Sequence, residues 1–328
     1  MVTRRRIILA LGAGALAAPL ASFSQKPEKI ARIGVLIPAS TPSYASRVEA
    51  LRAGLRDLGH IEGRHFVFEF RESEGKYDRL PALAAELVGL KVDVIVTGGT
   101  PGTRAIKQAT ATIPIVMAVS GDAVATGLIA SLARPGGNIT GTTYFDPELH
   151  VKRLELLKEV IPRVRRVGAL MNPENLQTVG STLPTLRRAA ELMKLDLPLF
   201  EARSPSEFES AFSAMVKKRT EAVEIADDPM FLGNLQAIAD FAVANRLPST
   251  GAKEFAEAGG LIGYGANFVE LWRRAAYFVD RILKGAKPGD LPVEQATRFE
   301  LVINLKTAKV LGIKIPQSVL VRADRVIE

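Results

Sequence analysis

The sequence has 328 residues, enough for about two domains, and 47% of them are hydrophobic. It contains no cysteine, which excludes thiol catalysis and thiolate metal sites. The formal net charge is +8, but acidic and basic residues are interspersed and no nucleic-acid-binding motif accompanies the basic clusters, so we expect no nucleic-acid partner.

The first 24 residues have the order of an export signal. Three arginines at 4–6 precede an uncharged run over 7–24, and Ser22 and Ser24 are the small residues before a cleavage point at Gln25. The run is too short and too rich in Gly and Ala for a transmembrane helix. The paired arginines also fit a twin-arginine signal. We therefore predict a signal peptide at 1–24 and a soluble mature chain in the periplasm.

Strand and helix patterns alternate through the next part of the chain. Apolar runs predict strands at 30–38, 92–97, 113–119 and 139–144, and residues 65–70 alternate as a strand does. Apolar stripes with helical spacing predict helices at 43–58, 77–90, 103–109 and 123–132.

The cycle restarts after a long predicted helix at 147–160. Strands are expected at 167–171, 197–202, 222–226, 248–251 and 261–264, and helices at 182–195, 205–218 and 234–245. A further helix at 269–284 is followed by a tail with a strand at 301–304 and a short helix at 307–311.

Hydrophobic strands that alternate with amphipathic helices predict parallel sheets covered on both faces. The pattern occurs twice, so the expected fold class is α/β with two Rossmann-like doubly wound parallel-sheet lobes. A single large sheet is the alternative. We expect the N-terminal lobe at 25–145 plus about 266–286, and the C-terminal lobe at 146–265 plus about 287–328.

Small polar and aromatic residues gather near the ends of the predicted strands, where such sheets bind ligands. The candidate ligand-binding residues are Ser40, Thr97, Gly99, Thr100, Ser120, Asp122, Thr143, Asn172, Asp228, Thr250, Phe255 and Tyr264. The glycine-rich turn at 98–103 opens a helix and is either an anion contact or a tight strand–helix turn.

Motifs for catalysis and cofactors are missing from the predicted mature chain. The dinucleotide fingerprint at 12–17 lies inside the signal, and no G-x-S-x-G elbow occurs. Asp227 and Asp228 are adjacent and point to different sides of a strand end, which does not suit a pair of acid/base carboxylates. The three histidines have no metal-ligand spacing. We expect a binding protein, with no cofactor and no metal, rather than an enzyme.

Six stretches carry a family resemblance that covers nearly the whole chain: 54–63, 80–88, 109–116, 127–141, 259–265 and 315–324. Through them the sequence resembles the substrate-binding proteins of bacterial ABC importers, in the subfamily related to tryptophan- and tyrosine-binding proteins. The resemblance implies a periplasmic binding protein of type I that captures a small molecule between two lobes. It also implies delivery to the permease subunits of an ABC importer. We expect a monomer, without the lipid anchor that a lipobox cysteine would carry.

The resemblance to amino-acid-binding relatives implies a small zwitterion or a related aromatic solute. Its anionic group would contact donors from Ser40, Thr97, Gly99, Thr100 and Ser120, and its cationic group would contact Asp228. Tyr264 or Phe255 would lie against its apolar body. The alternative for Asp228 is a helix-capping role before Pro229. The sequence departs from the family pattern at Gly263, where serine is common, which implies the loss of a hydroxyl contact.

Two other functions compete with this interpretation. A secreted enzyme on a similar fold would turn its ligand over. A sensor or repressor ligand-binding domain would need a helix-turn-helix before the first lobe, where the sequence has an export signal instead.

Overall fold

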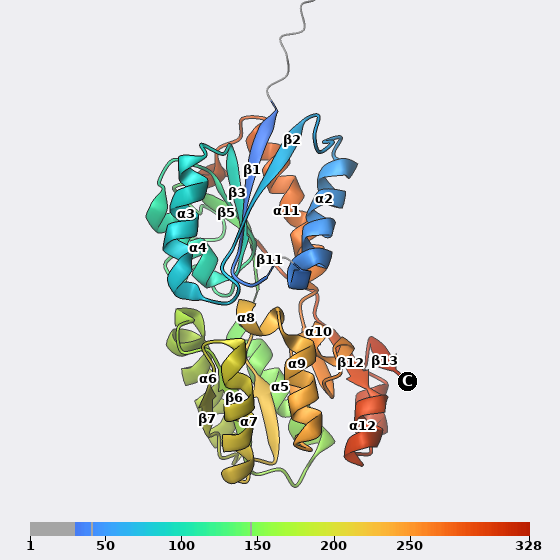
Figure 1. Cartoon of the computed structure of the whole chain (residues 1–328). Coiled ribbons are helices and arrows are strands. Elements are labelled where there is room, and N and C mark those ends of the chain that lie inside the picture. The colour runs from blue at the N-terminus through green and yellow to red at the C-terminus, as the bar shows by residue number, and fades with distance from the viewer. Residues whose placement is uncertain (1–29, 41, 145) are drawn as a thin grey trace, which may run out of the picture.

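A computed structural model describes residues 30–40, 42–144 and 146–328. The chain forms two α/β lobes stacked along one axis, with the C-terminus on the second (Figure 1). The predicted signal peptide at 1–24 lies outside the described residues. The expected alternative of a single large sheet is wrong, because the strands form two separate sheets.

The first lobe holds a six-stranded parallel sheet in the order β11-β5-β4-β3-β1-β2. Its strands are β1 (Ala31–Ile37), β2 (Phe66–Glu72), β3 (Val94–Gly98), β4 (Ile115–Val119), β5 (Ile139–Thr143) and β11 (Glu294–Gln295). Its helices are α2 (Ala45–Asp57), α3 (Leu80–Gly89), α4 (Thr100–Ala109) and α11 (Phe268–Leu283), with 3₁₀ turns at Pro42–Tyr44, Tyr77–Arg79 and Pro288–Asp290.

The two faces of this sheet belong to different hydrophobic cores, as the two-residue period of a strand requires. In β4, Ile115 and Met117 pack with the residues of α3 and α4, whereas Val116 and Ala118 pack with those of α2 and α11. The helix pairs α3–α4 and α2–α11 lie on opposite sides of the sheet (Figure 1).

The second lobe holds a seven-stranded sheet in the order β13-β12-β10-β9-β8-β6-β7. Its strands are β6 (Val167–Met171), β7 (Leu199–Glu201), β8 (Ala222–Ile225), β9 (Ser249–Gly251), β10 (Ile262–Gly265), β12 (Glu300–Asn304) and β13 (Arg325–Ile327). Its helices are α5 (Asp146–Val160), α6 (Leu183–Leu192), α7 (Phe208–Lys217), α8 (Pro229–Leu232), α9 (Leu235–Ala244), α10 (Lys253–Glu257), α12 (Leu305–Leu311) and α13 (Gln317–Leu320). A π-helical turn at Thr178–Thr182 leads into α6, and a 3₁₀ turn at Pro205–Glu207 into α7.

Parallel pairing holds everywhere in the two sheets except between β10 and β12, which are antiparallel. The C-terminal strands thus complete the second sheet: β12 runs antiparallel to β10, and β13 pairs with β12.

The chain passes between the two sheets three times: after β5, after β10, and between β11 and β12. The third passage lies later than the expected boundary near residue 287, because β11 pairs with β5 in the first sheet. A two-residue strand such as β11 has too few positions to show a periodic pattern.

The predicted helix at 123–132 is wrong. The segment forms turns in which the Asp122 carboxylate accepts hydrogen bonds from the backbone N–H groups of Val124 (3.1 Å) and Ala125 (2.9 Å). The turn cannot continue as a helix, because Gly127 has φ of +68° and the N–H of Leu128 donates back to the carbonyl of Ala123. The helix expected at 103–109 begins earlier, at Thr100, directly after Gly99.

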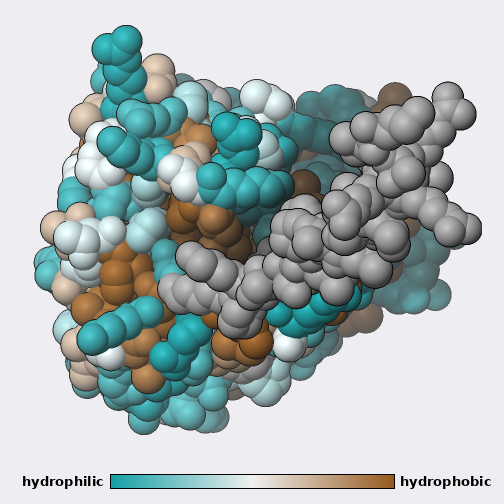
Figure 2. Space-filling model, turned by 90° about the horizontal axis from the view of Figure 1, so that it is seen from above, coloured by the Kyte–Doolittle hydropathy of each residue, from teal (hydrophilic) through white to brown (hydrophobic). Residues whose placement is uncertain are grey.

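The outer end of the first lobe is covered mainly by hydrophilic residues, with apolar areas between them (Figure 2). Over the described part of the chain, no helix combines the length and apolar character needed to cross a membrane.

Candidate ligand-binding site

A cavity lies between the lobes, at the carboxyl ends of both sets of parallel strands. In this arrangement its volume is about 20 Å³, room for about one water molecule, so a solute enters only when the lobes move apart. The first lobe contributes Tyr44, Gly99, Thr100, Val119, Gly121, Tyr144 and Phe268, and the second contributes Asn175, Gln177, Asp227, Pro229 and Leu232. Wider and more open depressions occur near the amino ends of the strands, at the outer end of each lobe. Another opens between the lobes beside the cavity, lined by Tyr77 and Arg104 of the first lobe and by Leu176 of the second.

Aromatic rings from the first lobe form one wall of this cavity. Tyr144 and Phe268 have ring centroids 5.5 Å apart, and Tyr44 packs edge-on against the buried Trp272 at 5.9 Å. Burial raises the pKa of Tyr44 to about 12, so its hydroxyl stays neutral. The wall therefore offers flat apolar surface with hydroxyl groups, which suits an aromatic solute.

The first lobe also supplies hydroxyl groups at the start of α4. Thr100 Oγ1 and Ser120 Oγ lie 3.3 Å apart and both residues are buried. Gly99 precedes the helix with φ of +86°, and its N–H donates to the carbonyl of Val119 at 2.7 Å. The hydroxyl pair, rather than the Gly99 N–H, is therefore the group that can contact an anion near the positive end of this helix.

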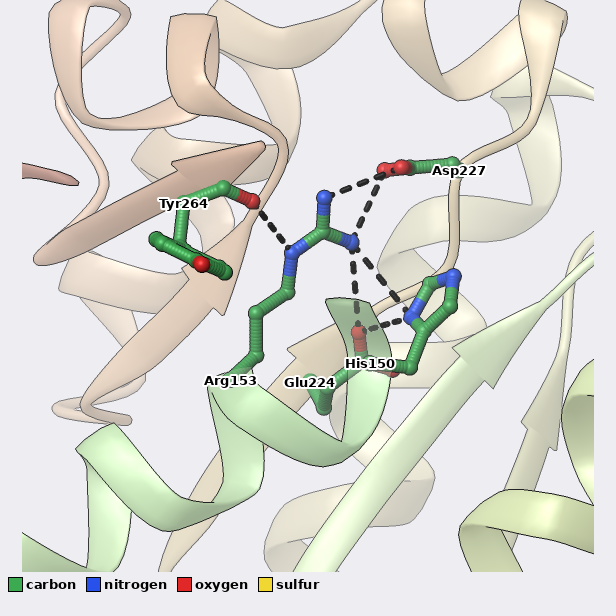
Figure 3. A network of polar contacts seen from close by, with 5 residues as sticks. All are labelled: His150, Arg153, Glu224, Asp227 and Tyr264. Carbon is green, nitrogen blue, oxygen red and sulfur yellow. Dashed lines mark hydrogen bonds and ion pairs between the residues drawn. The ribbon is translucent and has the colours of Figure 1, made fainter. Parts of the chain in front are cut away.

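A buried network of charged residues supports the floor of the cavity on the second lobe (Figure 3). Arg153 of α5 donates from Nη1 and Nη2 to the two carboxylate oxygens of Asp227, each at 2.9 Å. Its Nε donates to the carbonyl oxygen of Tyr264 at 2.8 Å. On its other side, His150 Nδ1 lies 2.5 Å from Glu224 Oε1, and that oxygen is 3.6 Å from Arg153.

The network keeps Arg153 charged although the residue is fully buried. Burial opposes its charge, but the carboxylates of Asp227 and Glu224 raise the pKa of Arg153. The carboxylate of Asp227 lies at the cavity, and its two hydrogen bonds with Arg153 fix its orientation.

Asp228 points elsewhere. Its Oδ1 accepts hydrogen bonds from the Tyr77 hydroxyl (2.8 Å) and the Met230 N–H (2.9 Å), and its Oδ2 accepts one from Asn175 Nδ2 (3.0 Å). Burial raises the pKa of this carboxyl to about 6, although these hydrogen bonds oppose the shift. Asp228 caps α8, which is the alternative role expected for it, and it does not line the cavity. The structure places Asp227 there instead of the predicted Asp228.

Several other predicted site residues serve the sheets and turns. Thr97 Oγ1 donates to the carbonyl of Leu36 at 2.9 Å, and Asp122 caps the turn after it. Thr143 Oγ1 donates to the carbonyls of Ser120, at 3.2 Å, and Gly121. These three side chains fix the loops that form the cavity but do not line it.

The remaining candidates also lie outside the cavity lining. Phe255 is buried in the core of the second lobe and the Tyr264 ring packs against Phe299, so neither provides the expected stacking surface. Ser40 is bonded to Ser43 at 3.1 Å, and Asn172 Oδ1 accepts from the N–H of Glu174 at 3.0 Å. Thr250 is buried in β9.

Gly263 has a structural reason for departing from the family pattern. A side chain there would meet the backbone carbonyl of Lys253 in α10 rather than a solute. Of the predicted residues, only Gly99 and Thr100 line the cavity, with Ser120 directly behind Thr100.

Sequence reasoning missed Tyr44, Asn175 and Arg153. Tyr44 belongs to an apolar stripe that predicts a buried helix face. Arg153 lies in a predicted helix, where an arginine is usually exposed to solvent. Asn175 follows a strand end by four residues, which is the one local signal that pointed towards the site. No cluster of three or more His, Asp or Glu residues suited to a metal ion occurs in the part of the chain that the structure describes.

Comparisons with known proteins identify the family and the fold. The family model for "ABC transporter substrate binding protein" matches residues 32–327. A curated relative, the tyrosine-binding protein of Clostridioides difficile (strain R20291), is 26% identical over 289 residues, covering 88% of this chain and 82% of the relative.

Two solved structures are similar over both lobes. A conserved domain protein from Vibrio cholerae is 30% identical with a TM-score of 0.84, covering 91% of this chain and all of the other. An ABC domain in complex with L-Trp from Streptococcus pneumoniae is 29% identical with a TM-score of 0.82, at the same coverage. The fold is that of a type I periplasmic binding protein.

Proposed function

The chain belongs to the ABC transporter substrate-binding protein family, and from this premise we propose that it captures an aromatic amino acid between its lobes. The observation that carries this proposal is the pairing, across one cavity, of an aromatic wall with a fixed carboxylate. Tyr44, Tyr144 and Phe268 face the cavity from the first lobe, and Asp227 and Asn175 face it from the second.

Each part of such a zwitterion has a matching group. The ammonium would contact Asp227, the carboxylate would accept a hydrogen bond from Thr100, whose hydroxyl lies against that of Ser120, and the ring would lie among the aromatic side chains. Similarity to a tyrosine-binding protein and to a structure in complex with L-Trp supports the same class of solute.

The proposal includes capture without turnover. Thr100 and Ser120 have each other as hydrogen-bond partners, which gives neither hydroxyl a general base. The protein would work in the periplasm as a monomer and deliver its solute to the permease subunits of an ABC importer. Recovery of unchanged solute from the complex by mass spectrometry tests the absence of turnover.

Thermal unfolding with and without solute tests the ligand class. A solute that binds only the folded chain stabilises it by about 2.7 kcal/mol when present at 100 times its Kd. We expect stabilisation by L-tryptophan or L-tyrosine and none by myo-inositol, which is polar but lacks a ring and charges. Stabilisation by the polyol alone would contradict the proposed class.

A further inference from the structure

Direct contacts join the two lobes beside the cavity, and they converge on the turn that starts α8. The Tyr77 hydroxyl donates to Asp228 Oδ1 at 2.8 Å and accepts from the Met230 N–H at 3.3 Å. The Tyr44 hydroxyl lies 3.4 Å from the carbonyl oxygen of Pro229. Tyr77 does not line the cavity that holds Asp227 but lines the more open depression beside it, with Arg104 and Leu176, so a solute in the cavity is not in contact with Tyr77.

Both partners of the shortest contact are held in place by their own lobe. Tyr77 packs with Leu80 and Leu83 in the core of the first lobe. Asp228 is held in the second lobe by Asn175 and by the N–H of Met230. Neither side chain has to be ordered when the lobes meet, so little conformational entropy opposes the bond.

The bond depends on lobe closure, because its partners lie on different lobes and 151 residues apart in the chain. In the present arrangement Asp228 is fully buried and Tyr77 is 9% exposed. Separating the lobes would return the carboxylate and the hydroxyl to water.

We propose that Tyr77 sets the affinity of this protein for its solute without touching it, by tying the lobes together through Asp228. Tyr77 is then a positioning residue. It contributes a part of the closure free energy that is the same whichever solute occupies the cavity. The observed affinity for every solute is proportional to the closed population, so loss of the Tyr77–Asp228 bond lowers all affinities by the same factor. This inference rests on solute capture between the lobes, not on the class of solute.

The Tyr77→Phe variant tests the tie, because it removes the hydroxyl and keeps the packed ring. Loss of a hydrogen bond to a buried carboxylate should weaken the binding of tryptophan, tyrosine and phenylalanine by one shared factor of about ten or more. Tyr277→Phe is the matched control, since the Tyr277 ring packs on Arg274 and Phe278 of its own helix. It should leave all affinities unchanged.

A double-mutant cycle with Asp228→Asn separates the tie from independent damage. Asparagine keeps the helix-capping oxygen but removes the charge. If the two residues act through one bond, the second substitution costs much less in the presence of the first. Additive losses, an unchanged affinity of Tyr77→Phe, or losses that differ between solutes would each overturn the proposal.

A measurement on the unliganded chain tests the Tyr77–Asp228 bond independently of which class of solute the protein binds. The chain has no cysteine, so Gln108→Cys and Leu192→Cys place one spin label on each lobe. Electron–electron distance measurements then report the closed population of the unliganded chain. We expect Tyr77→Phe to reduce that population even if no aromatic amino acid binds. A closed population that Tyr77→Phe leaves unchanged would overturn the tie while leaving solute capture intact.

Discussion

Arg153 and Asp227 form a bidentate ion pair at the floor of the interlobe cavity, with both N–O distances at 2.9 Å. Arg153 reaches Asp227 from α5, the first helix after the chain enters the second lobe, and it also holds the carbonyl of Tyr264 at the end of β10, just before the chain leaves that lobe. Through Arg153, the carboxylate proposed to contact the solute is therefore linked to the start and to the end of residues 146–265, the first segment of chain that lies in the second lobe.

Arg153→Met should destabilise the fold strongly, because it leaves the carboxylates of Asp227 and Glu224 buried without their cation. Removing one partner of a buried ion pair costs about 3–5 kcal/mol. Lys152→Met on the same helix is the control, since the Lys152 side chain is 41% exposed and its ion pair with Glu155 lies at the surface. Exposed pairs are worth roughly 1 kcal/mol or less. Urea denaturation compares the two, and equal losses would argue against the role assigned to Arg153.

Asp227→Asn should weaken the binding of an amino acid selectively at its ammonium group. Loss of a charge-assisted bond in a closed cavity costs about 1.5–3 kcal/mol, or about 10- to 150-fold in Kd. Calorimetry with tryptophan and with indole-3-propionate, which lacks the ammonium, isolates this contact. The variant should lose affinity only for tryptophan, whereas Asp228→Asn should weaken both ligands alike. If Asp228→Asn lost affinity only for tryptophan and Asp227→Asn weakened both ligands alike, the contact with the ammonium would belong to Asp228.

Gly99→Ala should prevent full closure of the lobes. A methyl group at Gly99 would collide with the ring of Pro229 on the opposite lobe. Gly137→Ala serves as the control, because Gly137 also has positive φ (+62°) but faces open space. Both variants should lose stability through backbone strain, but only Gly99→Ala should bind solute more weakly and stay expanded in small-angle scattering. Normal affinity of Gly99→Ala would exclude a closed state with this lobe contact.

The Asp228 carboxyl should make part of the stability depend on pH. Its folded pKa is raised from 3.8 to about 6 by burial, so the folded chain takes up this proton before the unfolded chain does. This group therefore disfavours folding above pH 6, and the penalty disappears as pH falls from about 6 to about 4. The effect is at most about 3 kcal/mol, since one pKa unit corresponds to about 1.4 kcal/mol.

The pH effect is measured as the difference in unfolding free energy between wild type and Asp228→Asn at pH 7.5 and pH 4.5. The comparison cancels the other titrating groups, including the buried Glu254, whose pKa is also raised by burial. The unfolding free energy of Asp228→Asn, relative to that of wild type, should be higher at pH 7.5 than at pH 4.5. A difference that does not change with pH would contradict the raised pKa.

The chain should be exported and cut before Gln25, because residues 1–25 have the basic, apolar and small-residue order of an export signal. Intact-mass spectrometry of the periplasmic fraction checks the cut, and an uncleaved chain there would contradict it. Replacing Arg4 and Arg5 by lysine tests the route: continued efficient export would favour the general pathway over the twin-arginine one.

The sequence alone determined the fold class and most elements, because their signals are local. The apolar run Ile115–Val119 predicts a buried strand wherever it pairs, and β6 was predicted at its observed bounds, Val167–Met171. Local chemistry also explains the failure at 123–132, where apolar residues have helical spacing but Gly127, with φ of +68°, ends the segment after one turn.

Only the tertiary structure decided which residues form the site. Asp227 and Asp228 are adjacent and chemically identical, and their roles differ because Arg153 lies 74 residues from one and Tyr77 lies 151 residues from the other. No local pattern encodes which side chains meet across a closed interface between two lobes. The sequence could therefore indicate the strand ends where a solute binds, whereas packing selected the carboxylate that faces the solute and the one that joins the lobes.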